Sequence, residues 1–250
     1  MKTKKKICLV TGGSRGIGRG LALILAKENY KIALSYNNNK ELATEVVNKI
    51  VNEGGEALAV RIAVEDRVSI QQGLDEIGQA FDSSVSLLVN NAAIAQEKPF
   101  LAITDADWLQ MLAVNLQGPF AIVQELIPSM IENEWGRIVN ITSIGGQWGG
   151  LNQVHYAASK AALINFTQSI AKLYSSYGIT SNAVSIGLAH TSMSDNEIGS
   201  NAGKQKVASI PIGRIAEIPE IAEVVKFLCS SGSSYITGQT INVNGGMYFG

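Results

Sequence analysis

The sequence is poor in the residues that form disulfides and structural metal sites. Its 250 residues include only two cysteines, Cys8 and Cys229, and two histidines, His155 and His190. Two cysteines make no disulfide framework, and these four positions are too few and too scattered for a Cys/His zinc site. We therefore expect neither a disulfide scaffold nor a bound metal.

Charge and long apolar runs are also scarce. Charged residues make up 16%, and 20 Lys+Arg against 21 Asp+Glu leave a net charge of −1. Partners such as nucleic acids and acidic membranes usually require a basic excess. The longest apolar run, 21–26, is far shorter than a membrane span, and the run at 7–10 is too short for a signal peptide. We expect a cytoplasmic protein with no nucleic-acid or membrane partner, whose low charge fits burial against other subunits or on both faces of a sheet.

What the sequence has is a regular alternation of short apolar runs and longer segments of helical period. The apolar runs predict strands at 7–11, 31–36, 56–62, 85–90, 137–142, 179–185 and 240–243. The helical periods predict helices at 16–28, 40–53, 66–80, 105–131, 155–177 and 220–229, the fourth interrupted at Gly118 and Pro119. Strands that are apolar throughout are typical of a parallel sheet covered on both faces. Without a linker or repeat, we predict one domain over 1–250, a doubly wound seven-stranded α/β sheet.

A glycine-rich turn at 11–18 joins the first predicted strand to the first predicted helix. Glycines let the backbone approach a pyrophosphate, and the helix N-terminus offers unpaired N–H groups. This indicates a dinucleotide site in the first βαβ unit. An ordinary glycine-rich turn is the alternative. Residues 12–16 also match G-x-S-x-G, the nucleophile elbow of hydrolases, but the sequence offers no convincing histidine partner.

The end of the second predicted strand bears on the choice of cofactor. It reads Ser-Tyr-Asn-Asn at 35–38, where an NAD enzyme would usually place Asp or Glu for the ribose 2′-hydroxyl. A 2′-phosphate would meet no repulsion there, and Arg15 in the glycine-rich turn can pair with it. We predict NADP(H), with NAD(H) as the alternative.

A tyrosine and a lysine lie on one face of the predicted helix at 155–177. Tyr156 and Lys160 are four residues apart, a spacing that Tyr36 and Lys40 share, but Ser143 ends a buried strand just before the first pair. Reduction of a carbonyl needs hydride on carbon and a proton on oxygen. A lysine ammonium about 4 Å away supplies energy of the order needed to lower a tyrosine pKa from about 10 toward about 7. Ser143 can donate to the same oxygen.

One amide interrupts an apolar helix face. Asn115 shares that face with Met111, Leu112 and Leu116. A buried amide is costly without hydrogen-bond partners. Asn115 is therefore either a satisfied core amide or a functional group.

Together these residues resemble the short-chain dehydrogenase/reductase family over essentially the whole chain. The matching positions are 11–18, Asn90–Ala93, Asn115, Ser143, Tyr156, Lys160, 182–184, 235–239 and 244–246. The resemblance implies a Rossmann fold and a homotetramer, or a dimer, that uses the helices at 105–131 and 155–177. It also implies that Tyr156 is the acid/base, Ser143 orients the carbonyl, Lys160 binds the nicotinamide ribose and tunes Tyr156, and Asn115 holds a water in a proton relay.

The glycine-rich turn and the resemblance together predict the cofactor contacts. They are Gly12, Ser14, Arg15, Gly16, Ile17, Gly18, Asn37, Ala63, Val64, Asn91, Ala92, Ala93, Tyr156, Lys160, Gly187, Ala189 and Thr191. Three positions depart mildly from the family pattern. Ala63 stands where an Asp usually binds the adenine amino group, Ala93 replaces a Gly, and Ile186 replaces a Pro. The missing Asp costs one hydrogen bond, worth about 0.5–1.5 kcal/mol.

Within the family, the chain is most similar to the 3-oxoacyl-[acyl-carrier-protein] reductase branch. That branch docks its acidic carrier through basic residues, whereas this chain has Glu132, Glu134 and Tyr177 in the corresponding stretches. Like charges disfavour such docking. The resemblance therefore leaves open an acyl-thioester substrate or a carrier-free ketone, sugar or secondary alcohol, and a non-catalytic dinucleotide sensor is the alternative from another class. The glycine-containing loop at 190–210 is predicted to cover the substrate as a lid.

Overall fold

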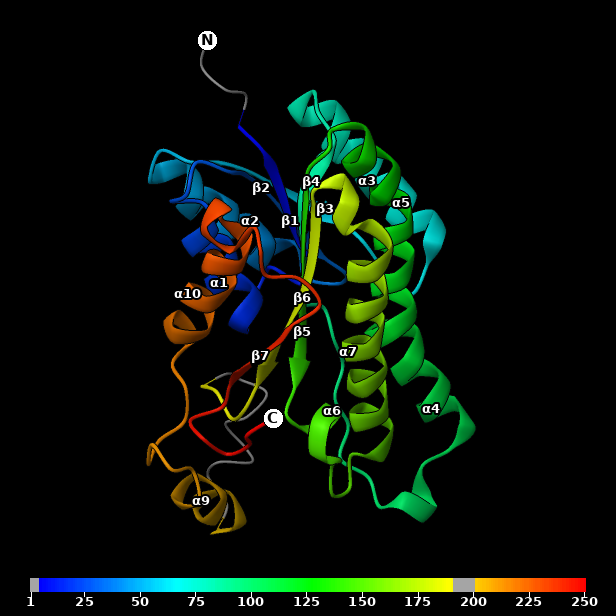
Figure 1. The fold of residues 1–250 in the computed structure, drawn as a ribbon, viewed down its shortest axis with the longest axis vertical. Coiled ribbons are helices and arrows are strands. Elements are labelled where there is room, and N and C mark those ends of the chain that lie inside the picture. Colours follow the sequence, from blue (N-terminus) through cyan, green and yellow to red (C-terminus); the bar gives the residue numbers. More distant parts are fainter. Residues whose placement is uncertain (1–4, 191–200) are drawn as a thin grey trace.

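The structure, a computed structural model that describes residues 5–190 and 201–250, is built around one parallel sheet (Figure 1). Its seven strands lie in the order β3-β2-β1-β4-β5-β6-β7, and all neighbouring pairs are parallel. They are β1 Ile7–Val10, β2 Lys31–Tyr36, β3 Glu56–Arg61, β4 Val85–Asn90, β5 Gly136–Ser143, β6 Ile179–Ile186 and β7 Thr240–Val243. The predicted fold class is confirmed. The order reverses between β1 and β4, and ligands bind at such a reversal in open α/β sheets.

Helices cover both faces of the sheet (Figure 1). One face carries α1 Gly16–Leu25, α2 Lys40–Asn52 and α10 Ile218–Cys229. The other carries α3 Arg67–Phe81, α5 Gly118–Glu132 and α7 Val154–Tyr174. Successive strand residues point to opposite faces, so Cys8 and Val10 enter one apolar core while Ile7 and Leu9 enter the other. This explains why the strands read as unbroken apolar runs.

The helix predicted over 105–131 has its irregularity in a different place. It consists of α4 Asp105–Leu112, a π-helical turn η2 Ala113–Gln117, and α5. The chain is not interrupted at Gly118 and Pro119; instead the wider turn precedes them, and the Gly118 N–H donates to the carbonyl of Ala113. Pro119 falls in the first turn of α5 and has no N–H to donate.

The segment predicted as a loop over 190–210 contains a helix, α9 Asn201–Ala208. Positions 191–200 lie outside the described residues, so the predicted lid cannot be compared there. Three short elements were not predicted: η1 Phe100–Ala102, α6 Gly145–Trp148 and η4 Ser231–Ser233. The last residues of the helix predicted over 155–177 form a separate 3-10 helix, η3 Ser175–Tyr177. The remaining predicted strands and helices are present, and their ends differ from the predicted ones by at most three residues.

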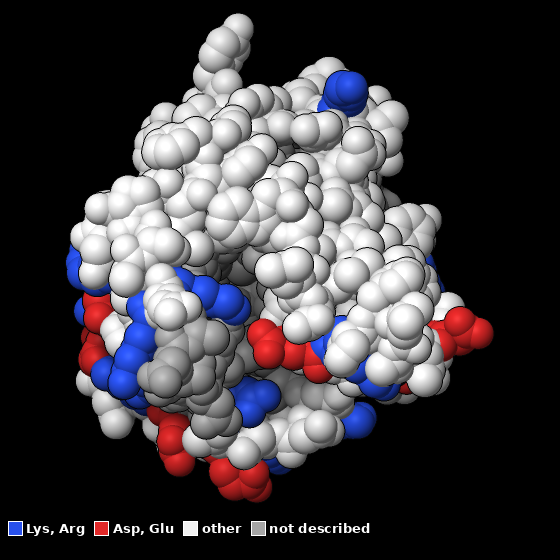
Figure 2. Space-filling view, turned by 90° about the horizontal axis from the view of Figure 1, so that it is seen from below, with Lys and Arg blue, Asp and Glu red and all other residues white. Residues whose placement is uncertain are grey.

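The carboxyl ends of the strands meet at one end of the molecule, the bottom of Figure 1. Figure 2 looks onto this end and shows a surface hollowed near its centre, with Lys and Arg side chains bordering the hollow on the left of the view. Within the described part of the chain, no helix has the length and apolar character to cross a bilayer.

Candidate active site

The glycine-rich turn after β1 is packed so closely that side chains would not fit. A Cβ at Gly18 would lie 2.3 Å from the carbonyl oxygen of Gly12, and one at Gly12 would lie 3.0 Å from Cα of Ala92. Gly12 also has φ +63°, a left-handed conformation that favours glycine. The glycines therefore leave the backbone of this turn free of side chains at the point where the strand order reverses, and a pyrophosphate can approach it closely.

The residues that follow β4 hold this turn in place. The side-chain amide of Asn91 donates to the carbonyls of Thr11 (2.9 Å) and Gly12 (3.2 Å). In return, the Thr11 hydroxyl accepts from the backbone N–H groups of Asn91 (2.9 Å) and Ala92 (3.0 Å). Asn91 and Ala92 were predicted as cofactor contacts, and the structure shows that they also clamp the glycine-rich turn. Sequence reasoning gave no such role to Thr11.

The first turn of α1 is suited to an anion. Arg15 caps the helix in an extended conformation without a side-chain capping bond, and the first turn contains no acidic residue. The N–H groups at the start of a helix have no intrahelical partner and carry a partial positive charge. Gly16, Ile17 and Gly18 supply these groups, so the residues present fit a bound dinucleotide phosphate.

The predicted adenosine end lies where β2 and β3 finish. Asn37 is exposed directly after β2, and the Nε of Arg61, the last residue of β3, donates to its carbonyl at 3.3 Å. Sequence reasoning missed Arg61 because nothing along the chain shows that β3 ends beside β2. The Ala63 N–H donates to the Ser69 hydroxyl at 2.9 Å, while the Ala63 methyl group offers no acceptor to an adenine.

Val64 completes this end of the site by packing against α5. A Cβ at Gly118 would lie 2.7 Å from the Val64 carbonyl oxygen, so glycine is required for this approach.

Ser143, Tyr156 and Lys160 meet beyond the end of β5. The Nζ of Lys160 donates to the carbonyl of Ile141 at 3.0 Å and lies 5.7 Å from the centroid of the Tyr156 ring. The Ser143 hydroxyl lies close enough to the Tyr156 hydroxyl to lower the tyrosine pKa. The predicted trio is therefore brought together, and Lys160 is only 3% exposed.

Burial governs the titration of both ionisable groups of the trio. It lowers the pKa of Lys160 to about 8. It also raises the pKa of Tyr156, an effect that the Ser143 hydroxyl partly opposes. The sequence argument expected Lys160 to lower the tyrosine pKa. In the protein chain alone the direction is the reverse, because both charged forms lose solvation.

Asn115 lies in the π-helical turn and is fully buried. Its side-chain oxygen accepts from the Ile94 N–H at 2.9 Å, and its amide donates to the Ile94 carbonyl at 2.9 Å and the Ser159 hydroxyl at 3.1 Å. The side chain is thus a satisfied core amide. The α-helical partner of its backbone carbonyl would be the N–H of residue 119, which Pro119 lacks.

The loop after β6 closes the other side of the site. A Cβ at Gly187 would lie 2.9 Å from Cα of Asn244, so this glycine lets the loop pack on the segment after β7. Ile186 and Ala189 are buried, and Ala189 bridges to Ala216. Thr191, the last predicted cofactor contact, lies outside the described residues.

Buried polar side chains tie β4, β5 and α7 together, and sequence reasoning missed most of them. Asn90 donates to Asn140 at 2.8 Å, and Asn140 donates to Thr167 of α7 at 2.8 Å. A polar residue in an apolar run is the signal that would have suggested such a network, since a buried amide needs a partner.

Comparisons with known proteins agree with this geometry. A family model described as Enoyl-(Acyl carrier protein) reductase matches residues 12–248. The chain belongs to the short-chain dehydrogenase/reductase family. It is 40% identical over 243 residues to the 3-oxoacyl-[acyl-carrier-protein] reductase FabG of Staphylococcus epidermidis, covering 97% of this chain and 99% of the relative. The FabG of Aquifex aeolicus is 41% identical over 250 residues, covering 99% of both chains.

A solved structure of the same family has a similar fold. A crystal structure from Agrobacterium tumefaciens, described as a candidate gluconate dehydrogenase, has a TM-score of 0.93 and 31% identity, covering 97% of this chain and 95% of that one. The short-chain dehydrogenase/reductase assignment, the oxidoreductase class and the likeness to 3-oxoacyl reductases are thereby confirmed. The similarity extends over nearly the whole length, so it includes both the glycine-rich turn and the Tyr156 helix.

Proposed function

We propose that this enzyme uses NADPH to reduce a 3-oxoacyl thioester to the 3-hydroxyacyl form, in the manner of the fatty-acid-synthesis reductases it resembles. The observation that carries the proposal is the meeting of Ser143, Tyr156 and Lys160 at the carboxyl edge of β5. The two FabG relatives, similar over nearly their whole length, support the substrate class.

A bound nicotinamide would supply the hydride that reduces the carbonyl carbon. The Tyr156 hydroxyl donates its proton to the carbonyl oxygen, and Ser143 donates a hydrogen bond to the same oxygen. Lys160 would hold the nicotinamide ribose and, as a cation, would favour the tyrosinate left behind. The Asn115 carbonyl, which Pro119 leaves without an α-helical partner, holds a water through which Tyr156 regains a proton.

We retain the predicted cofactor contacts and add Arg61. They are Gly12, Ser14, Arg15, Gly16, Ile17, Gly18, Asn37, Arg61, Ala63, Val64, Asn91, Ala92, Ala93, Tyr156, Lys160, Gly187, Ala189 and Thr191. Preference for NADPH rests on Arg15 in the glycine-rich turn, on Arg61 beside the end of β2, and on the absence of an acid at 32–39. A guanidinium pairs well with a 2′-phosphate.

A second candidate substrate is a carrier-free carbonyl or alcohol, such as a sugar acid. The candidate gluconate dehydrogenase is the structural observation that favours it. The charges at 132 and 134 favour it as well, because two exposed glutamates would repel an acidic carrier.

We propose a cytoplasmic homotetramer whose subunits are single domains. The subunits would meet through the outer faces of α4, α5 and α7, and these faces expose large apolar side chains. They are Trp108, Leu109, Phe120 and Leu173, with exposed fractions of 38%, 64%, 42% and 62%. Apolar exposure of this kind marks interaction surfaces.

A carbonyl panel tests the proposed function. Purified enzyme is mixed with NADPH or NADH and with acetoacetyl thioester, acetoacetyl-carrier protein, a 2-enoyl thioester, a free ketone and 5-ketogluconate, and cofactor oxidation is followed by absorbance. We expect the 3-oxoacyl thioesters to react fastest with NADPH. Exclusive turnover of the sugar acid or the enoyl thioester would refute the proposed substrate class.

A further inference from the structure

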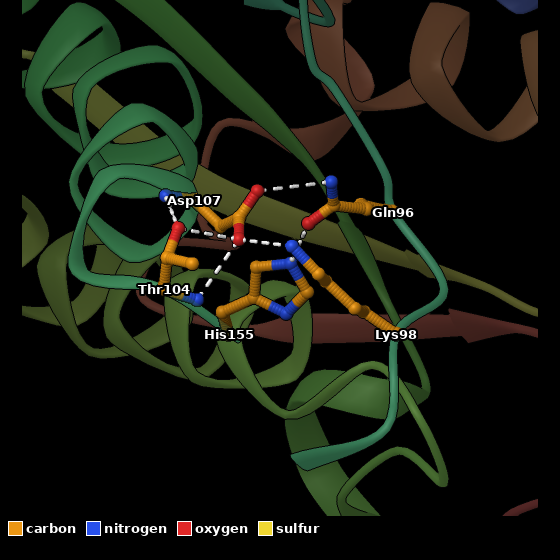
Figure 3. Close-up of polar contacts among 5 residues, drawn as sticks. All are labelled: Gln96, Lys98, Thr104, Asp107 and His155. Carbon is orange, nitrogen blue, oxygen red and sulfur yellow. Dashed lines mark hydrogen bonds and ion pairs between the residues drawn. The ribbon is translucent and has the colours of Figure 1, made fainter. Parts of the chain in front are cut away.

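A buried histidine stands directly beside the candidate acid/base. His155, in the first turn of α7, is fully buried, and Tyr156 follows it in the chain. Its Nε2 lies 2.9 Å from Oε1 of Gln96, on the segment that follows β4. Figure 3 shows the ring and this amide pointing toward one another, with Asp107 of α4 beyond. None of the chemistry assigned above uses His155.

The hydrogen bonds around Gln96 determine which nitrogen of the ring carries the proton. Gln96 Nε2 donates to Oδ1 of Asp107 at 3.1 Å, and a carboxylate can only accept. The amide oxygen must therefore face His155, so the ring donates through Nε2. Its Nδ1 is buried and has no hydrogen-bond partner among the described residues. The hydrogen bonds thus run in one direction, from His155 to Gln96 and from Gln96 to Asp107, and these three residues are here called the His155 relay.

The carboxylate that accepts the last hydrogen bond of the relay is held firmly. Asp107 accepts from Lys98 Nζ at 2.5 Å, from the Thr104 hydroxyl at 2.7 Å and from the Thr104 N–H at 2.9 Å (Figure 3). These donors hold the pKa of Asp107 well below its usual range. Because Asp107 stays ionised, the orientation of the Gln96 amide is fixed.

The relay also joins the segment after β4 to the helix that carries Tyr156. On the other side of Tyr156, its backbone carbonyl accepts from the Ser159 hydroxyl at 2.7 Å, and Asn115 donates to that hydroxyl at 3.1 Å. Asn115 is in turn bonded to Ile94. The first turn of α7 is therefore held at two points, through His155 before Tyr156 and through Ser159 after it.

We propose that His155 is a positioning residue for Tyr156, and that the Asp107–Gln96–His155 relay sets the rotation of the first turn of α7. This rests on the proposed acid/base role of Tyr156. Proton transfer needs the donor oxygen within hydrogen-bond reach of the carbonyl oxygen, and a displacement of about 1 Å can cost about 10²-fold in rate. A fixed helix turn keeps the Tyr156 hydroxyl beside Ser143.

The first experiment measures the ring itself and needs no substrate. The chain has two histidines, so a ¹⁵N-histidine spectrum contains two rings, and a His190→Gln variant assigns them. We expect the His155 ring to carry a proton on Nε2. This proton should be protected from solvent exchange at least tenfold more than in the Gln96→Met variant. A proton on Nδ1, or no loss of protection on Gln96→Met, would overturn the proposal.

The second experiment uses two substitutions that differ in reach. A glutamine amide can place its nitrogen near the position of Nε2, whereas an asparagine amide is too short to reach Gln96. We expect His155→Gln to keep kcat within threefold and His155→Asn to lose at least tenfold, with the NADPH Kd within twofold in both. Gln153→Ala, which removes an exposed contact to Glu97 between the same two segments, is the control and keeps kcat.

A double-mutant cycle separates positioning from a general structural role. In a Tyr156→Phe background there is no hydroxyl to orient, so His155→Asn is expected to change the residual rate less than twofold. An equal loss in both backgrounds, or equal rates for the Gln and Asn variants, would refute the proposal. If His155→Asn fails to fold, Gln96→Met takes its place in the cycle with the same expectation. A wild-type enzyme that reduces no carbonyl would refute the proposed function, while the tautomer measurement still decides the relay.

Discussion

The two halves of the sheet contribute to the site with different parts of the chain. In the β1–β3 half, the glycine-rich turn offers backbone: N–H groups at the start of α1 and glycines where a Cβ would collide. In the β4–β6 half, the working groups are side chains, and most of them are buried or partly buried. Lys160 is even a buried cation for which the described residues offer no carboxylate partner.

The difference follows from the work that each half does. A dinucleotide phosphate is bound by many N–H groups at fixed positions, which a tight backbone supplies without titratable groups. Moving a proton requires a side chain with a suitable pKa, and such side chains are tuned by burial and by neighbours. Burial of polar groups is costly unless they are bonded, which explains why Asn90 and Asn140 are paired in the sheet and why Asn115 and Ser159 are paired beside Tyr156.

The largest effect is expected from removing the proton donor of the β4–β6 half. Tyr156→Phe keeps the ring and removes the hydroxyl, so kcat should fall at least about 10²-fold. The NADPH Kd should change less than threefold, because most of the proposed cofactor contacts lie elsewhere and the phenylalanine ring is retained. Steady-state rates and cofactor titration measure the two quantities. A phenylalanine variant within threefold of wild-type kcat would show that Tyr156 is not the acid.

Lys160 is expected to destabilise the fold more at neutral pH, where its buried side chain is charged, than at alkaline pH, where it is not. Burial lowers the pKa of Lys160 from 10.5 to about 8. The unfolded chain therefore binds this proton more tightly, and the free energy of unfolding should rise with pH between these values. Relative to Lys160→Met, wild type should gain about 2–3 kcal/mol between pH 7 and pH 10.5.

Urea unfolding of both proteins across this range is the measurement. Lys160→Met removes the cation and should abolish this gain, although it also removes the bond to the Ile141 carbonyl at every pH. If the free energy of unfolding changed with pH in the same way for both proteins, Lys160 would be better solvated than its 3% exposure indicates.

The contrast between the halves also explains what could be predicted from the sequence. The glycine spacing at 11–18 and the Tyr156–Lys160 spacing are local, so they were found directly, and apolar runs were sufficient for the sheet and its helices. Arg61 and the His155 relay were missed because they depend on which strand ends lie side by side. The irregularity in the helix over 105–131 was predicted at the wrong place, because the pattern showed Gly118 and Pro119 and not the packing around Asn115.

In the β1–β3 half, a single methyl group should weaken cofactor binding without harming the chemistry. A Cβ at Gly18 would lie 2.3 Å from the Gly12 carbonyl oxygen and 2.5 Å from Asn91 Nδ2. Gly18→Ala should therefore raise the NADPH Kd at least about tenfold, a loss of about 1.4 kcal/mol. At saturating NADPH, kcat should stay within threefold.

A matched control for Gly18→Ala lies in α3. The nearest atom to a Cβ at Gly78 is the Ser83 carbonyl oxygen at 3.9 Å, so alanine fits there. Gly78→Ala should leave the Kd unchanged and stabilise the helix by about 0.5–1 kcal/mol. Equal NADPH Kd values for Gly18→Ala and Gly78→Ala would show that the close packing of the glycine-rich turn does not determine cofactor affinity.

Cofactor preference should depend on two arginines that lie far apart in the chain. Arg15→Ala and Arg61→Ala should each raise the NADPH Kd about tenfold and leave the NADH Kd within twofold, since only NADPH carries the 2′-phosphate. Arg19, exposed on α1, provides the control because it lies outside the predicted contacts. Fluorescence titration with both cofactors gives the values. If Arg61→Ala weakens NADH binding as much as NADPH binding, Arg61 holds Asn37 in place and does not bind the 2′-phosphate.

The smallest effect is expected from the glutamates at the opposite end of the sheet. Glu132 ends α5 and Glu134 lies just before β5, whereas Ser143 ends that eight-residue strand, about 25 Å away. This distance exceeds the Debye length of about 8 Å at physiological salt, so the two charges act weakly on the site of their own subunit. They can still repel an acidic carrier that approaches this face.

Changing Glu132 and Glu134 to Lys should therefore raise kcat/KM for acetoacetyl-carrier protein about two- to fivefold at low salt, with kcat unchanged. The gain should disappear as salt rises, because steering acts on the association rate. A short acetoacetyl thioester should show no change, and the control Asp75→Lys with Glu76→Lys, on exposed positions of α3, should give none with either substrate. If the glutamate pair and the control behave alike with the carrier, the carrier docks elsewhere, and repulsion at 132 and 134 no longer supports a carrier-free substrate.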